Sequence, residues 1–354
     1  MIDYVNKDKE NVIITFDEFI NIEKQIQDMQ CIFHPLYAVD GRLSINQVMQ
    51  LKAQGKEIIV NLDRNIFTDI VKVVRQGTLK AEDDLRKIAL LMAWSGLNGI
   101  AIMPHDAIAE NARKFQNNVE ANAEMECFDF AFRRIECKTW LDVALRGKSI
   151  VTPTITGSYA LNDLEIDFCN ESLDYLYHYA AMIHFVRIAR SKVTWEEQIK
   201  DFFRWYLDNS IVCQYVLVYV ILYYANQYKV KLPKHAMSKE INKVIEGCKN
   251  QARDLCYLSE WSKIYANDYY DDEYEMFFAT FDFLLGKIFS ICHKVNDAKE
   301  LFALFTNGKG NELYEFYHEL CLKHKKIEID GEQKDYCWNL IEEELQALRR
   351  EINE

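Results

Sequence analysis

The sequence predicts an α/β fold with a parallel sheet, helices on both faces of that sheet, and more helix than strand. Three short apolar segments, residues 58–62, 99–104 and 275–281, have the length and continuous hydrophobicity of buried strands. Helical patterns separate them, and this alternation is typical of a parallel sheet. The chain has only 4 Pro and 12 Gly, with no Gly between Gly157 and Gly247, which favours long helices over a turn-rich β fold.

The N-terminal part is predicted to be an α/β extension of this core. The apolar segment VIITF at residues 12–16 predicts a short strand, and an amphipathic helix is expected from Asp17 to Met29. A second helix is expected from Ser44 to Gln54, because serine is a favourable N-cap and a glycine follows the last helical position.

The first two core strands are each followed by helices. The segment IFTDIVKVV after Asn65 has a helical pattern, and a clear helix extends from Ala81 to Ser95, where Gly96 is predicted to end it. The segment DAIAENARKF then begins another helix after the second strand. We expect the strands that bracket these helices to be parallel neighbours.

Long helical patterns dominate from about residue 111 to residue 251, interrupted by one polar stretch at 151–163. We interpret this region as a helical insertion. Its predicted helices cover residues 112–145, 173–190, 195–209 and the apolar segment after residue 211, and further helices are expected over 239–266 and 336–352. The predicted domains are an N-terminal α/β extension (1–55), a first core part (56–112), the helical insertion (113–249), a second core part (250–300) and C-terminal helices (301–354).

The composition limits the classes of function. A net charge of −13 argues against a protein that coats nucleic acid nonspecifically, because such binding depends on Lys and Arg neutralising phosphates. It does not exclude an enzyme that acts on nucleic acid, since acidic metal sites add negative charge and a local basic surface can coexist with them.

The cysteines and the N-terminus predict a cytoplasmic protein. Ten cysteines occur without a C-x-x-C pair, and the first residues lack the basic and apolar stretches of a signal peptide. The uncharged segment from Ile211 to Tyr228 is interrupted by Gln and Asn, so its apolar part is shorter than a bilayer span and a buried core helix is expected. No membrane association is predicted.

Four acidic residues occupy positions related to the predicted strands. Asp63 follows the first core strand in NLDRN, and Glu110 lies one turn into the helix after the second strand. Asp254 lies within a helix, and Asp282 follows the third strand in ATFDFLL. Because pockets of parallel α/β sheets form outside the carboxyl ends of the strands, we expect Asp63 and Asp282 to line such a pocket.

This order of residues resembles PIN-domain nucleases. The resemblance is carried by Asp63-x-Asn65 after the first core strand and by Thr280-x-Asp282 after the third, with Glu110 and Asp254 matching by position and order. It covers roughly residues 56–112 and 250–290. Arg64 stands between Asp63 and Asn65, where the family has a small hydroxyl residue, and brings a cation beside the predicted site.

The resemblance implies a metal-dependent endonuclease that acts on RNA rather than on single-stranded DNA. Asp63, Glu110, Asp254 and Asp282 would then bind Mg²⁺ or Mn²⁺, with Asn65 and Thr280 orienting them. Hard divalent cations prefer carboxylate oxygens, and they can activate water and neutralise a scissile phosphate. A weaker nucleic-acid contact is predicted for basic residues near aromatic ones, namely Arg64, Arg113, Lys114, Arg187 and Arg190.

Simpler roles remain open for the same residues. Asp63 and Asp282 are each placed to cap the helix that follows, and Asn65 to stabilise the turn. Glu110 could face solvent, with Asp106 as an alternative helix cap, and Asp254 could form a surface ion pair. The corresponding functional alternative is a catalytically inactive PIN-like module that regulates or binds a protein partner, or a second copy of itself, through its helical regions.

Overall fold

The computed structural model describes residues 14–152, 166–209, 213–266, 273–295, 297–324 and 332–353. Residues 12–13 of the first predicted strand and most of the polar stretch 151–163 lie outside these ranges. The rest of that predicted strand is not a strand. Thr15 instead begins a helix, because its hydroxyl and the Glu18 carboxylate satisfy each other's backbone N–H groups in a capping box.

The chain divides into two compact units, and the helical insertion predicted at 113–249 is shared between them. Unit 1 contains the described residues of 1–170 and 261–286, and unit 2 those of 171–260 and 287–354. The predicted N-terminal extension therefore belongs to the same unit as the sheet. The described residues of the segment 113–170 also belong to unit 1, because the helices of this segment pack on the helices beside the sheet.

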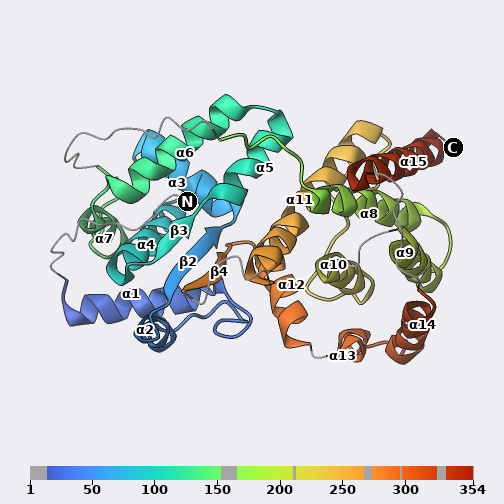
Figure 1. Cartoon of the computed structure of the whole chain (residues 1–354), viewed down its shortest axis with the longest axis horizontal. Helices are drawn as coiled ribbons and strands as arrows, with labels where there is room; N and C mark the ends of the chain where they lie inside the picture. Colours follow the sequence, from blue (N-terminus) through green and yellow to red (C-terminus); the bar gives the residue numbers. More distant parts are fainter. Residues whose placement is uncertain are drawn as a thin grey trace. The chain divides into compact units, whose positions relative to one another are not determined.

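The described part of unit 1 contains a four-stranded sheet with the order β1-β4-β2-β3 (Figure 1). Strand β2 pairs in parallel with both β3 and β4, as the sequence predicts, while the two-residue strand β1 pairs antiparallel with β4 and was not expected. The strands are β1 (Ile32–Phe33), β2 (Glu57–Leu62), β3 (Ala101–Met103) and β4 (Tyr274–Ala279).

Helices lie around this sheet in Figure 1, with α6 and α7 packing on α3, α4 and α5. The helices are α1 (Phe16–Met29), α2 (Ile45–Ala53), α3 (Arg64–Gln76), α4 (Glu82–Asn98), α5 (His105–Phe115), α6 (Asn118–Arg133) and α7 (Cys137–Leu145). Ser44 caps α2, as predicted. Helix α4 was predicted to end at Gly96 but continues to Asn98, and Gly99 ends it in a left-handed conformation with φ +54°. Left-handed backbone is the usual role of glycine at this position.

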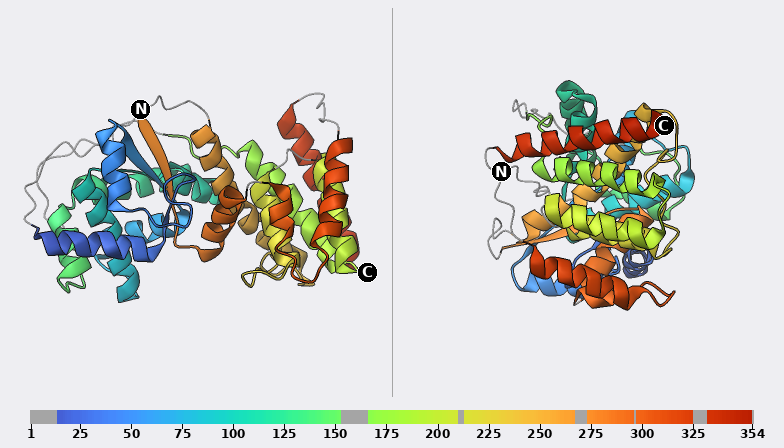
Figure 2. Two further views of the ribbon diagram at one scale, coloured as in Figure 1. Left: turned by 90° about the horizontal axis from the view of Figure 1, so that it is seen from below. Right: turned by 90° about the vertical axis from the view of Figure 1, so that its right-hand side faces the viewer.

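Helices are the only regular elements among the described residues of unit 2, which Figure 2 shows from two further directions. Helix α15 packs along α8, and α9 packs between α8 and α14. The helices are α8 (Leu173–Arg190), α9 (Trp195–Asn209), α10 (Gln214–Tyr224), α11 (Ile241–Ala266), α12 (Phe283–Lys294), α13 (Ala298–Phe302), α14 (Gly310–Lys323) and α15 (Gln333–Asn353), of which α11 and α12 each cross from one unit into the other.

The uncharged segment near residue 211 forms the short buried helix α10 where it is described. Its side chains from Tyr215 to Leu222 are all buried, which agrees with the prediction of a core helix. In the part of the chain that the structure describes, we find no helix with both the length and the apolar character needed to cross a bilayer.

A buried histidine lies at the edge of the sheet in unit 1. His34 Nδ1 accepts hydrogen bonds from the backbone N–H groups of Leu36 and Tyr37, at 3.1 and 3.3 Å. The proton of the neutral ring is therefore on Nε2, which donates to Glu275 at 2.8 Å, and Lys56 contacts the other oxygen of that carboxylate. Burial lowers the pKa of His34 although Glu275 opposes the shift.

This histidine predicts a loss of stability at mildly acidic pH. The unfolded chain takes up a proton on His34 near pH 6.5, whereas the folded protein resists it, so stability should fall as pH decreases from 6.5. One such group contributes at most about 1.4 kcal/mol per pH unit. Urea unfolding at pH 7.5, 6.5 and 5.5 should show a smaller decrease for His34→Gln than for the wild type. His318→Gln, at an exposed ring, is the control, and equal slopes in all three proteins would contradict the prediction.

Candidate functional site

Asp63 directly follows the last residue of β2, and the hydrogen bonding between β2 and β4 extends as far as Asp63. Its backbone N–H donates to the carbonyl of Ala279 at 2.9 Å, directly after the last register pair of β2 and β4. Asp63 occupies the N-cap position of α3 with extended backbone, yet its side chain makes no capping hydrogen bond. The simpler explanation, that this carboxylate caps the helix, is therefore not what the structure shows.

The carboxylate of Asp63 is instead held by the neighbouring strand. Thr280 Oγ1 donates to Asp63 Oδ2 at 2.6 Å, and Asn65 Nδ2 contacts the same oxygen at 3.3 Å. Asp63 is 3% exposed and Thr280 is 2% exposed. Burial raises the pKa of Asp63, and the charge of Asp282 raises it further, although the Thr280 hydrogen bond opposes the shift. A buried carboxylate with an acidic neighbour is a group that a cation would stabilise.

Asp282 begins helix α12 and is linked to Asp63 through one hydroxyl. Its backbone N–H donates to Thr280 Oγ1 at 2.9 Å, so this hydroxyl contacts both acidic residues. Asp282 Oδ1 accepts the backbone N–H groups of Leu284 and Leu285 at 2.7 and 3.0 Å, which makes Asp282 the cap of α12. Within the described part of the chain, its Oδ2 accepts no hydrogen bond and remains free to bind a cation.

A second buried polar pair lies beside Asp63 and was not predicted. Asn61, two residues before Asp63 in the chain, donates from Nδ2 to Asp106 Oδ2 at 2.6 Å. The sequence suggests a helix cap at Asp106, but burial raises the pKa of this residue and its carboxyl accepts a hydrogen bond from Asn61 on the strand. Asn61 Oδ1 is buried without a hydrogen-bond partner among the described residues. An asparagine inside an otherwise apolar strand was the sequence signal for this pair.

The other two predicted acids are placed differently. Glu110 is partly buried on α5, one turn beyond Asp106. Asp254 belongs to unit 2, where its charge contributes, after burial, to the raised pKa of Tyr219. Among the described residues no three His, Cys, Asp or Glu side chains form a group able to hold a metal ion. Metal binding by Glu110 and Asp254 stays a prediction.

The guanidinium of Arg64, which was predicted to contact nucleic acid, is bound by other groups of the protein. Its guanidinium makes two hydrogen bonds of 2.7 Å to the carboxylate of Glu124 on α6, and a third of 3.1 Å to the carbonyl of Ala107 on α5. It also lies over the Phe67 ring at 5.3 Å. Glu124 thus balances the charge of Arg64. Through these contacts the Arg64 side chain links the start of α3 to α5 and α6.

The remaining basic residues predicted to contact nucleic acid are mostly paired with protein groups. In unit 2, Arg187 binds Glu344 and Glu351, and Arg190 donates to two backbone carbonyls. In unit 1, the charge of Arg113 counteracts the raised pKa of Asp106, and exposed Lys114 lies over the Phe115 ring. Since nonspecific affinity for nucleic acid depends on cations free to neutralise phosphates, the pairing of Arg187 weakens its predicted role.

Asp63 and Asp282 suit a hard divalent cation. Magnesium is commonly bound by one or two carboxylates, with water and substrate phosphate completing its shell, so two acids are sufficient. The fit rests on three features of this structure: a buried carboxylate whose pKa is raised, a second acid whose charge contributes to that shift, and the unpartnered acceptor oxygen of Asn61. The Thr280 hydroxyl would fix the orientation of the Asp63 carboxylate and the backbone position of Asp282.

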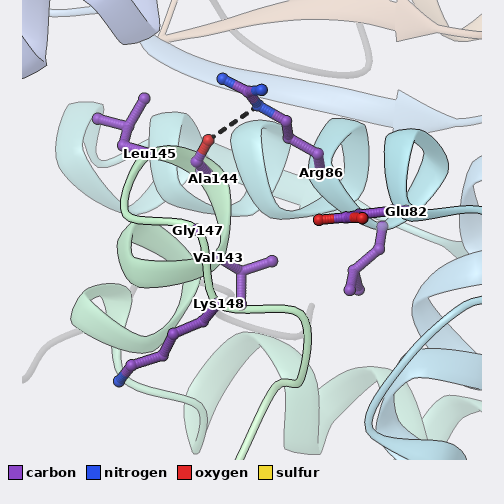
Figure 3. Close-up of a pocket in the computed structure, with 8 residues that line it drawn as sticks. Glu82, Arg86, Val143, Ala144, Leu145, Gly147 and Lys148 are labelled. Carbon is purple, nitrogen blue, oxygen red and sulfur yellow. Dashed lines mark hydrogen bonds between the residues drawn. The ribbon is translucent and has the colours of Figure 1, made fainter.

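A small pocket lies elsewhere in unit 1, between α4 and α7 (Figure 3). It holds about 140 Å³ and is lined by residues that include Glu82, Arg86 and Lys148, with a 3.0 Å hydrogen bond from Arg86 to the carbonyl of Ala144 on its wall. Ligand sites usually measure about 300–1,000 Å³. None of the lining residues is a predicted site residue, so this pocket does not contribute to the site.

Comparison of the chain with protein-family models, with curated proteins and with solved structures yields no match. The resemblance to PIN-domain nucleases therefore rests on the residues quoted from the sequence.

Proposed function

We propose that unit 1 is a metal-dependent phosphodiesterase of the PIN type, acting on RNA as an endoribonuclease. The observation that carries the proposal is the link Asp63–Thr280–Asp282 at the carboxyl ends of two adjacent parallel strands. This is the edge where parallel α/β sheets place their ligands. The choice of RNA comes from the resemblance of Asp63-x-Asn65 and Thr280-x-Asp282 to that family.

In this proposal Asp63 and Asp282 hold Mg²⁺ or Mn²⁺. The cation would activate water and offset the charge of the scissile phosphate. Thr280 and Asn65 keep the Asp63 carboxylate in place through the contacts to its Oδ2. Asp282 has a double role, because Oδ1 caps α12 while Oδ2 is available for binding. Hydrolysis would leave a 5′ phosphate on one product.

Substitution Asp63→Asn tests the metal site without requiring a substrate. We expect millimolar Mn²⁺ to raise the melting temperature of the wild type and to leave that of the variant unchanged, because a ligand specific to the folded state stabilises it by about 1.4 kcal/mol at ten times its Kd. Without metal, the variant should melt higher than the wild type at pH 7, since it no longer buries a charge at Asp63. A wild type that Mn²⁺ does not stabilise contradicts metal binding at this site.

Activity is tested on the same samples with single-stranded and structured RNA in Mn²⁺, Mg²⁺ or EDTA. Cleavage that requires the metal and is lost in Asp63→Asn is the expected result. Cleavage that persists in EDTA would contradict the need for a metal, and cleavage that persists in Asp63→Asn would remove Asp63 from the chemistry. Single-stranded DNA is included as a further substrate. Its cleavage would contradict the choice of RNA but not the choice of site residues.

A second candidate function is a PIN-like interaction module without catalysis. Two contacts favour it: Asp282 already caps α12, and Arg64 is bound to Glu124, so both residues have roles in stabilising the fold. This alternative predicts no stabilisation by Mn²⁺, no cleavage of any substrate, and a protein partner that remains bound through purification.

A further inference from the structure

Three polar side chains from different helices meet inside unit 2. His178 on α8 and Ser259 on α11 are 2% and 8% exposed, and Cys213 stands immediately before α10. The Cys213 Sγ lies 3.4 Å from His178 Nε2 and 3.1 Å from Ser259 Oγ, and these two atoms are 2.8 Å apart. Each member of this thiol cluster, Cys213, His178 and Ser259, thus contacts the other two.

The backbone of Cys213 is also fixed. The hydroxyl of Tyr206, a residue 1% exposed on α9, contacts both the backbone N–H and the carbonyl of Cys213. Cys213 is the N-cap residue of α10, an 11-residue helix, so its sulfur lies near the positive end of that helix. A negative charge on the sulfur is stabilised in this position.

The charges around the cluster favour an ion pair. Burial disfavours the thiolate, but the charge and hydrogen bond of His178, together with the hydrogen bond of Ser259, outweigh it and lower the pKa of Cys213 to about 7. Burial likewise opposes the imidazolium, but Cys213 outweighs it and raises the pKa of His178, helped by Asp174 and Glu260.

Two further titratable groups lie near the cluster. Tyr206 and Cys292 both interact electrostatically with Cys213, and burial holds the pKa of each well above its ordinary value, so both remain neutral at pH 7. They therefore add no competing negative charge beside the sulfur. The neighbouring charged groups are His178, Asp174 and Glu260.

We propose that Cys213 is a reactive thiolate that small hydroperoxides oxidise, with His178 as its proton donor. The sulfur attacks one peroxide oxygen and the O–O bond breaks. The attacked oxygen, with its hydrogen, stays on Cys213 as a sulfenic acid, and the other oxygen leaves as hydroxide, which takes the proton of the His178 imidazolium and becomes water. The sulfur loses two electrons and the peroxide gains them. Cys213 is partly exposed as a residue, and hydrogen peroxide, a molecule of two heavy atoms, is the hydroperoxide that needs the least space to approach its sulfur.

Alkylation as a function of pH is the first test. Each of Cys213 and Cys321 is the sole cysteine of its tryptic peptide, so mass spectrometry reports both in one sample. We expect the iodoacetamide rate at Cys213 to rise with a midpoint near pH 7 in the full-length wild type, and with a midpoint at clearly higher pH in His178→Gln, because burial then raises the pKa of Cys213 without the opposing effect of His178. At pH 7 the variant should react at least about tenfold more slowly, because the loss of ionised thiol outweighs the greater nucleophilicity of a thiolate with a higher pKa. Exposed Cys321 monitors the reagent.

Oxidation is the second test. After brief exposure to hydrogen peroxide, dimedone should label Cys213 in the wild type before it labels Cys321, and Ser259→Ala should shift the alkylation midpoint upwards by less than His178→Gln does. Equal alkylation rates at pH 7 in wild type and His178→Gln overturn the proposal, as does sulfenic acid on Cys321 but not on Cys213. If His178→Gln only loosens the packing of the helices, Cys213 should react faster than in the wild type at every pH. That result would also contradict the proposal.

Discussion

RNA cleavage should fall by at least about 100-fold in Asp282→Asn, while the melting temperature changes little. Asparagine caps a helix about as well as aspartate, so the bonds that Asp282 Oδ1 accepts from Leu284 and Leu285 can be retained. What the substitution removes is the negative charge and one of the two proposed cation ligands. Single-turnover cleavage in Mn²⁺ measures the loss, and thermal unfolding measures the stability.

The matched control is the same substitution at a helix cap without a proposed catalytic role. Asp297 accepts the backbone N–H of Glu300 at 3.0 Å and caps α13. Asp297→Asn should cleave RNA at the wild-type rate. In contrast, Asp282→Ala should lose both the cap and the activity, with a stability cost of about 1 kcal/mol. Full activity in Asp282→Asn would show that this residue serves the helix alone.

Removal of Glu124 should destabilise unit 1 by about 3 kcal/mol. The side chains of Arg64 and Glu124 are 16% and 7% exposed, and both guanidinium hydrogen bonds are 2.7 Å long. In Glu124→Ala the largely buried cation of Arg64 would keep only the Ala107 carbonyl and the Phe67 ring as partners. The free energy of unfolding in urea measures the effect.

Two further variants separate this cost from the general loss of an ion pair. Asp84 and Lys87 form an exposed pair on α4 at 3.1 Å, and Asp84→Ala should change stability by about 0.5 kcal/mol or less. The double variant Arg64→Met with Glu124→Leu should recover most of the stability, since no charge is then left buried. A loss below about 1 kcal/mol in Glu124→Ala would mean that solvent reaches Arg64 easily.

The sequence by itself determined most elements that depend on neighbouring residues. Helix α8 has the bounds predicted for it, Leu173–Arg190, because Ser172 caps it and its apolar pattern is local. The parallel pairing of β2 with β3 and β4 followed from the alternation of strands and helices. The end predicted for α4 was wrong. Gly96 lies within the helix and packs against Cys137, whereas Gly99 is the residue with left-handed backbone.

Only the tertiary structure decided which side chains meet. Residue types suggested Asp63 and Asp282, but the link through Thr280 depends on the register of strands more than 200 residues apart. An asparagine inside β2 indicates a buried polar partner but not that the partner is Asp106. The thiol cluster could not be predicted, because no local pattern relates Cys213 to His178 and Ser259. Local preferences act over a few residues, whereas such contacts form only when whole helices and strands pack and place distant side chains within hydrogen-bond reach.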